Sequence, residues 1–178
     1  MNSQMVGMSL KGERVTVKVR NDSSSAMPLG TPVGLSLDGT EDGLAVKLPA
    51  DMSTQALADI FFFGVITDAT IAANAIGNSQ TFGLVQKAVI RRGTRAASTD
   101  NWAGSTSIAK GVLLMCDTVN NCFSTLANAS SFASTDTIAS RGAFAFLAQD
   151  VASFASTGST SGSNTALTTY AKVFVRSL

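Results

Sequence analysis

The sequence predicts an all-β protein: a single small β-sandwich or barrel, of the jelly-roll or β-tulip type, with an extended N-terminal arm. Short apolar runs that alternate with polar residues recur along the 178 residues, turn residues separate them, and helical periodicity is almost absent. A chain of this length fits one domain with a sizeable core. We therefore expect an arm over residues 1–12 and one β domain over residues 13–178, which becomes rich in Ser, Thr and Ala from about residue 124.

The N-terminal segment predicts the arm and the first strand. Residues 1–12 contain three methionines and no clean period, as expected of an extended arm. Val15, Val17 and Val19 then alternate with polar residues, which is the pattern of a half-buried strand. Two prolines within residues 27–32 favour a rigid connection, because each lacks a backbone donor.

A hairpin and a short helical turn are expected next. Residues 33–37 and 44–48 alternate apolar side chains, and the Asp-Gly dipeptides between them supply a turn. Pro49 ends the second strand. Residues 51–58 have the composition of one short helical turn.

The stretch that begins at Phe61 and ends at Arg95 is the expected centre of the sheet. Its first run, Phe61–Ile66, is rich in aromatic and β-branched residues and predicts a strand buried on both faces. Residues 72–74 and 76–78 predict turns. A second strand, Phe82–Ile90, is expected to leave the core towards a wet edge.

Two glycines, Gly64 and Gly83, interrupt these two strands. A glycine inside a strand weakens it, because it has no side chain to pack and loses more backbone entropy on folding than other residues. Both positions therefore predict bulges or the close approach of another backbone.

The C-terminal half predicts further strands and loops. Residues 95–111 are polar and small and predict a loop, while residues 155–169 are the best candidate for a mobile loop. Phenylalanines in the Ser/Thr/Ala-rich part argue against disorder there. Strands are expected at residues 112–115, 121–126, 142–147 and 170–176.

Cys116 and Cys122 lie in an expected hairpin whose register has two alternatives. A three-residue loop centred on Val119 would place the cysteines opposite each other, whereas a two-residue turn at residues 120–121 would leave Cys116 facing Thr125. In a reducing compartment, both thiols are expected to be buried and free. Two thiols without further ligands are too few for a structural zinc site.

Composition excludes several kinds of chemistry. The chain has no histidine, which removes every Ser-His-Asp and Cys-His arrangement. Only 14% of residues are charged and the net charge is +1. The chain therefore lacks a long-range electrostatic field that would attract nucleic acid, and its weakly charged surface favours association with other proteins. Neither a secretory leader nor a long apolar segment is evident, and we expect a soluble protein made in a cytosol that uses no membrane.

Two motifs resemble functional sites. The first is better explained as turn residues, and the second as a chance match. Asp38, Glu41 and Asp42 have the opening spacing of a calcium loop, but Pro49 stands where the bidentate glutamate belongs. Residues 107–110 match the Ser-x-x-Lys motif of penicillin-recognising enzymes, without the partner motifs of that class. A hydrolase that uses Ser107 and Lys110 is thus a remote alternative, and we predict no catalytic, metal-binding or cofactor-binding residue.

One cationic cluster stands out. It is either a solvated strand end or a contact for an acidic protein surface or a phosphate. Without interleaved aromatic residues it does not indicate nucleic-acid binding. Its members are Lys87, Arg91, Arg92 and Arg95.

Three segments together resemble the small all-β head decoration, or capsid cement, proteins of tailed bacteriophages. They are Val15 to Ser36, Phe61 to Arg95, and Val112 to Phe123. The shared features are a strand into a polar turn and a Gly-Thr-Pro-Val entry, followed by Phe-Gly-Val and Gly-Leu-Val strands. The resemblance covers roughly residues 13 to 125, and the Ser/Thr/Ala-rich part after Phe123 does not match.

The resemblance implies a non-enzymatic protein on the outer capsid surface of a virion, made in the host cytoplasm. Its expected partner is the major capsid protein, whose subunits it would bridge to stabilise the expanded shell, and it is expected to be a homo-oligomer, with a trimer favoured over a dimer. The alternative function is a glycan-binding or adhesive module that uses Trp102 as its platform. The candidate capsid contacts are Met5 and Met8 of the arm together with Lys87, Arg91, Arg92 and Arg95.

Overall fold

The computed structural model describes residues 13–37, 44–52, 58, 61–95, 102–103, 107–117, 120–125, 144–152 and 168–177. Their secondary structure is nearly all β, which confirms the predicted fold class. A single 3₁₀ turn, η1 (Pro49–Asp51), follows β4. The strands are β1 (Val15–Asn21), β2 (Met27–Pro28), β3 (Pro32–Leu35), β4 (Ala45–Lys47), β5 (Phe62–Ile66), β6 (Thr70–Ile71), β7 (Ile76–Arg95), β8 (Trp102–Ala103), β9 (Leu113–Asp117), β10 (Cys122–Thr125), β11 (Phe144–Leu147) and β12 (Thr168–Arg176).

The first lobe is a closed barrel of five strands. β1 pairs with β4, β4 with β3, β3 with β5, β5 with β7, and β7 pairs back to β1. We call this unit the N-barrel. Its interior is apolar, as expected where strands turn alternate side chains inward. The core consists of Val19, Met27, Val33, Val46, Leu48, Phe63, Ile66 and Ile71.

The second lobe closes in the same way around the other half of β7. β7 pairs with β10, β10 with β9, β9 with β11, β11 with β12, and β12 pairs back to β7. We call this unit the C-barrel. Its buried core includes Val85, Ala88, Ile90, Leu114, Cys116, Phe123, Ala145, Leu147, Ala171, Val173 and Val175.

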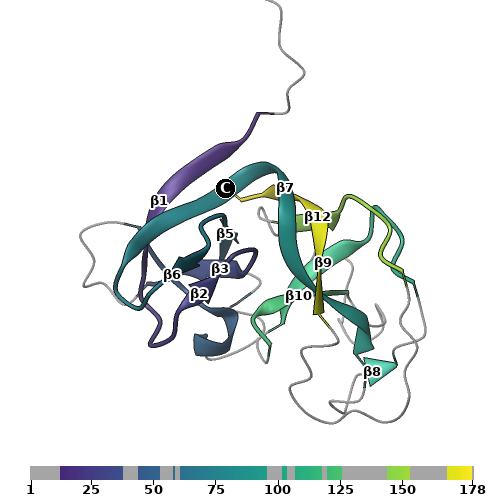
Figure 1. The fold of residues 1–178 in the computed structure, drawn as a ribbon, viewed down its shortest axis with the longest axis horizontal. Coiled ribbons are helices and arrows are strands. Elements are labelled where there is room, and N and C mark those ends of the chain that lie inside the picture. The colour runs from purple at the N-terminus through teal and green to yellow at the C-terminus, as the bar shows by residue number, and fades with distance from the viewer. Residues whose placement is uncertain are drawn as a thin grey trace, which may run out of the picture.

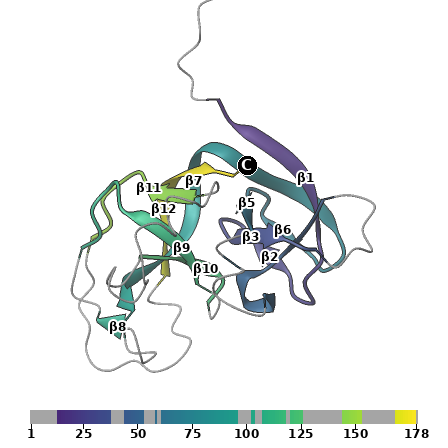
Figure 2. The ribbon, with the colours of Figure 1, turned by 180° about the vertical axis from the view of Figure 1, so that it is seen from behind.

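Strand β7 belongs to both barrels. Figure 1 shows it arching from the lobe that contains β1, β3 and β5 to the lobe that contains β9, β10 and β12, and Figure 2 shows the same arch from behind. β5 of the N-barrel also contributes Phe62 and Val65 to the core of the C-barrel, where the rings of Phe62 and Phe123 of β10 meet edge to face at 5.6 Å. The bend of β7 is thus fixed by packing on both sides.

Bulges and a glycine produce the bend of β7. Between Gln80 and Phe82 the register against β1 shifts, so that Thr81 is an extra residue. Gly83 has a φ of +94°, and a Cβ there would lie 2.3 Å from the carbonyl oxygen of Glu13. A bulge next to a residue with positive φ turns a strand sharply, and only glycine allows the backbone of Glu13 to approach this closely.

Several sequence predictions are confirmed. β5 is buried at every position, and a Cβ at Gly64 would lie 2.5 Å from the carbonyl oxygen of Gln80, so another backbone does come close. The hairpin of β3 and β4 forms as predicted, with Leu35 opposite Val46. Strands β1, β9, β10, β11 and β12 also lie where the alternation placed them.

Two predictions around β7 are wrong. Residues 76–78 are not a turn but the start of β7, where they pair with β1; the turn lies just before them, at Asn74 with a φ of +61°. The predicted strand Phe82–Ile90, which forms part of β7, also does not leave the core at its end. Ile90 is fully buried and Arg91 is only 4% exposed, because the C-barrel closes around this half of the strand.

Neither predicted cysteine register is observed. Cys122 pairs with Asp117, and Cys116 pairs with Phe123. Both thiols are buried and free, as predicted.

Some predictions concern residues outside the described ranges. These are the arm of residues 1–12 with Met5 and Met8, the turn at residues 38–43, and most of the loop predicted at residues 155–169, whose last two residues instead begin β12. Most of the helical turn expected at residues 51–58 also lies outside, as does the side chain of Trp102. Within the predicted loop of residues 95–111, β8 pairs with the end of β7, and Ile108 bridges to Val151.

Candidate functional site

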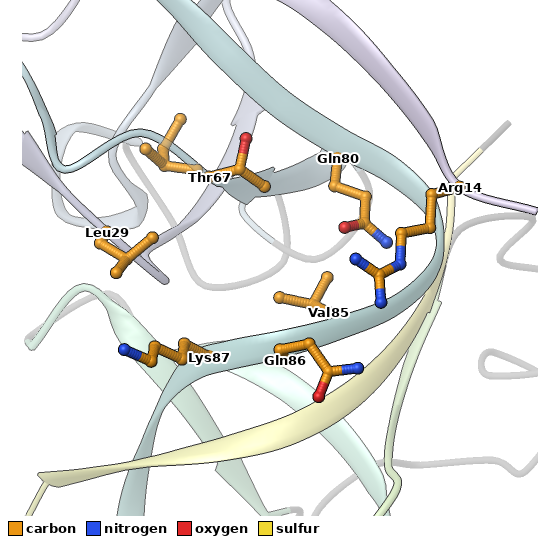
Figure 3. A pocket seen from close by; sticks show the side chains of 8 residues that line it. Arg14, Leu29, Thr67, Gln80, Val85, Gln86 and Lys87 are labelled. Carbon is orange, nitrogen blue, oxygen red and sulfur yellow. The ribbon is translucent and has the colours of Figure 1, made fainter. Parts of the chain in front are cut away.

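A cleft lies on the inner side of the bend in β7, between the two barrels. Its volume is about 220 Å³. Figure 3 shows Gln80 on one limb of β7 and Val85, Gln86 and Lys87 on the other, with Arg14 at the bend. The lining residues are Arg14, Leu29, Ile66, Thr67, Gln80, Val85, Gln86 and Lys87, and we call this site the bend cleft.

A second bulge explains why Gln86 and Lys87, which are consecutive in β7, both line the bend cleft. Val173 of β12 pairs with Val85, and Ala171 pairs with Ala88, so Lys172 alone faces two residues of β7. In a regular strand Gln86 and Lys87 would point to opposite faces. The bulge re-aims one of them, and both side chains are exposed.

The turn that contains Leu29 and Gly30 forms one wall of the cleft. Gly30 has a φ of +82°, and its carbonyl oxygen accepts a hydrogen bond of 2.9 Å from the backbone N–H of Val89. A Cβ at Gly30 would lie 2.5 Å from the carbonyl oxygen of Lys87. The turn therefore lies directly on the backbone of β7, which fixes the distance between Leu29 and Lys87.

The lining of the bend cleft carries positive charge and no carboxylate. Arg14 and Lys87 are both exposed, and among the described residues neither is ion-paired with a carboxylate. Two acidic residues adjoin lining residues in sequence, Glu13 beside Arg14 and Asp68 beside Thr67, but neither lines the cleft. Glu13 is exposed, and the carboxylate of Asp68 accepts hydrogen bonds from the backbone and side-chain nitrogens of Asn78. The cleft thus attracts anionic groups, because two cationic side chains line it and no carboxylate does.

The size of the bend cleft limits what it can hold. Pockets for drug-sized ligands and cofactors usually measure roughly 300–1,000 Å³. At about 220 Å³ the cleft is smaller than these pockets, so it suits a few side chains of a partner rather than a whole cofactor or drug-sized ligand. Its base is apolar, since Ile66 is fully buried and Val85 is 3% exposed.

The structure divides the cationic cluster that the sequence suggested. Lys87 lies in the bend cleft beside residues of the N-barrel. The prediction for Arg91 is wrong: we expected it on the surface, either at a solvated strand end or as a contact for a partner, but it is buried, and its Nη1 lies 3.5 Å from Oδ2 of Asp117. Arg92 and Arg95 lie in β7, and their side chains are outside the described part of the structure. A surface cluster of all four residues is thus not formed.

Asp117 organises the polar interior of the C-barrel. Besides Arg91, its carboxylate accepts hydrogen bonds from the backbone N–H of Asn120, at 3.2 Å, and from its side-chain amide, at 3.0 Å. These contacts join β7 to the β9–β10 turn.

Burial raises the pKa of the nearby Cys122 thiol far above its ordinary value, and the charge of Asp117 raises it further. A reactive thiolate is therefore disfavoured at this position.

A second surface feature lies on the outer face of β12. Buried residues alternate with exposed ones along the strand, and the exposed ones are aromatic and cationic in turn. Tyr170 is 53% exposed and Phe174 is 36% exposed. The ring of Phe174 meets that of Phe82 edge to face at 5.6 Å. We call Tyr170, Lys172, Phe174 and Arg176, with Phe82 and the exposed Val15 opposite it, the β12 face.

Sequence reasoning identified one residue of these two sites, Lys87. Arg14 was missed because it lies 73 positions away and reaches the cleft only through the contact of Glu13 with Gly83. The alternation at the C-terminus did predict the strand. The alternation did not show which set of side chains faces outward. In the structure Ala171, Val173 and Val175 fill the core, so the aromatic residues Tyr170 and Phe174 lie on the outer face.

The remaining candidate motifs carry no chemistry in the described residues. Ser107 and Lys110 are both exposed, and the backbone N–H of Lys110 donates to Asp150 in a surface turn. Activating a lysine requires desolvation or a cationic neighbour, which this turn does not supply. Within the described ranges, no three His, Cys, Asp or Glu side chains gather as a metal site. The same part of the chain contains no helix with the length and hydropathy needed to cross a bilayer.

The chain matches no protein-family model and has no significant match among curated proteins.

Proposed function

We propose that this chain is a structural decoration, or cement, protein of a tailed-phage head. It binds the outer surface of the expanded shell, bridges neighbouring major capsid protein subunits and does no catalysis. Three segments support this through their resemblance to that family, and they build β1 to β3, β5 to β7, and the hairpin of β9 and β10. They thus supply most of the N-barrel and the strand that both barrels share.

The β12 face is the observation that carries the proposal. Interfaces between proteins are enriched in aromatic residues and arginine, and this face alternates exposed Tyr170 and Phe174 with Lys172 and Arg176. Fully burying a large apolar side chain contributes about 1.5–3 kcal/mol, and covering the exposed parts of Tyr170 and Phe174 contributes a fraction of this for each. A homo-oligomer brings several copies of this face to the shell at once, so a modest contact by each copy suffices for firm attachment.

Self-association on the shell is part of the proposal. A trimer would match the local three-fold axes of an icosahedral lattice, and a dimer would match the two-fold axes. The low fraction of charged residues, 14%, limits repulsion between copies.

Co-sedimentation tests the proposal. Expanded shells that lack the chain, prepared from its native source, are mixed with purified protein and pelleted. We expect saturable binding that falls at least about tenfold for Tyr170→Ser combined with Phe174→Ser. Leu37→Ser is the matched control, because Leu37 is a 65% exposed apolar residue outside the β12 face. Absence of binding by the unchanged chain would refute the proposal.

A glycan-binding function receives no specific support. Its expected platform was Trp102, whose side chain lies outside the described residues.

A further inference from the structure

We propose that the bend cleft is a docking slot for an acidic, partly apolar segment of a partner protein, whose carboxylates bind Arg14 and Lys87. The proposal deepens the proposed function, on which it rests for the identity of the partner. The binding chemistry itself is argued from the cleft alone.

The two cations lie at opposite ends of the bend cleft. In Figure 3, Arg14 stands at the bend of β7 and Lys87 at the far end of the lower limb, with Val85 between them. One small anion cannot engage both groups when they are spread in this way. A segment with two acidic side chains separated along an extended chain can do so.

The middle of the cleft is apolar. Leu29 forms one wall, and the buried Ile66 and Val85 form the base. An apolar side chain between two carboxylates would lie there and be removed from water. Alternate residues of an extended strand point to the same side, so the matching pattern is acid-x-apolar-x-acid.

The hydrogen-bonding groups that remain free also favour an anionic partner. The side-chain amide of Gln80 donates to the carbonyl oxygen of Phe82 at 3.0 Å, and the hydroxyl of Thr67 donates to the carbonyl oxygen of Asn78 at 3.2 Å. These contacts use the hydroxyl of Thr67 and one N–H of the Gln80 amide within the fold. Besides the exposed amide of Gln86, Arg14 and Lys87 remain as the charged donors that line the cleft.

Nucleic acid and free phosphate fit this site less well. None of the lining residues is aromatic, so a base has no ring on which to stack. Phosphate sites usually converge several donors, often backbone N–H groups, on one point. The spread cations and apolar base of the bend cleft instead match a protein segment.

A peptide titration followed by NMR tests the slot directly. The full chain, labelled with ¹⁵N, is titrated with acetyl-Glu-Ser-Leu-Ser-Glu-amide and, separately, with the Gln-Ser-Leu-Ser-Gln analogue. We expect saturable shifts confined to the lining of the bend cleft, and binding about tenfold weaker for the uncharged analogue. Arg14→Gln and Lys87→Gln should each weaken binding about two- to fivefold. Lys110→Gln, which removes an exposed charge elsewhere, should not.

Three results of the titration would overturn the proposal. They are equal shifts with both peptides, no saturable shift at all, and shifts centred away from the cleft. Inorganic phosphate is run in parallel, and shifts equal to those of the acidic peptide would overturn the assignment to a protein segment. Unchanged urea midpoints of the variants show that the fold is intact.

Shell binding separates this proposal from the proposed function. If shells bind the unchanged chain and the Arg14→Gln/Lys87→Gln variant equally well, the slot is refuted and the proposed function stands. If the chain ignores shells but binds the acidic peptide in the cleft, the proposed function fails and the slot stands. We expect shells to bind the double variant about tenfold more weakly, with a smaller dependence on salt.

Discussion

Replacing Asp117 by Asn should destabilise the C-barrel more than any other single removal of charge among the described residues. The side chain of Asp117 is 2% exposed and that of its partner Arg91 is 5% exposed, with 3.5 Å between Nη1 and Oδ2. Asp117→Asn keeps the shape and removes the charge. The guanidinium of Arg91 then stays buried and loses the charge of the Asp117 carboxylate.

The expected cost is about 3 kcal/mol. Removing one partner of a buried ion pair typically costs roughly 3–5 kcal/mol. The lower end applies here, because an Asn side chain can still accept the hydrogen bond from the backbone N–H of Asn120. For a chain of this size, this loss lowers the melting temperature by roughly 6–12 °C.

Urea unfolding measured by circular dichroism is the assay, with Asp150→Asn as the matched control. Asp150 is exposed and accepts one hydrogen bond from the backbone N–H of Lys110, so its variant should cost less than about 1 kcal/mol. Arg91→Met combined with Asp117→Leu should cost less than the sum of the single changes. A loss below about 1 kcal/mol for Asp117→Asn, at an unchanged urea m-value, would refute the buried-pair argument.

Three further predictions concern the thiols, the turn at the bend cleft and the β12 face. Because burial raises the pKa of Cys122 in the folded chain, the unfolded chain ionises first; the stability that Cys122 contributes should be complete below about pH 8.5 and fall above it, so above that pH the free energy of unfolding should fall more steeply than in Cys122→Ala. A thiol reagent should label Cys122 only in urea, and rapid labelling of the native chain would contradict its burial. Gly30→Ala should cost about 2–3 kcal/mol in urea unfolding, whereas Gly111→Ala should cost about 1 kcal/mol, since both residues have positive φ but only Gly30 lies against another backbone; equal losses would contradict this. Phe174→Ala should cost only about 1 kcal/mol through its ring contact with Phe82, and a loss above 3 kcal/mol would place Phe174 in the core instead.

Local patterns predicted the strands well, because alternation and turn residues are short-range signals. The burial of β5 followed from its unbroken apolar run, and Gly64 and Gly83 correctly indicated close backbone contacts. The failure at residues 76–78 has a physical reason. Ile76 and Gly77 resemble a turn locally, but pairing with Arg20 and Val19 of β1 provides the hydrogen bonds that make them a strand.

The sharing of β7 by two barrels could not be predicted, because it depends on pairings between distant strands. The same limit applies to the bend cleft. In the sequence, charge alone groups Lys87 with Arg91, which lies four positions further along the chain. A bulge opposite Lys172 turns Lys87 outward, while ladder pairing keeps Arg91 inside with Asp117. Bulges change the face on which a residue lies, and the residue types alone do not reveal where they occur.

Electron microscopy of particles from the native source tests the central claim most directly. A reconstruction should show density of two adjoining barrels on the outer surface of the head, with the β12 face turned towards the major capsid protein. Heads that carry no such density, although the chain is made in the infected cell, would contradict the account.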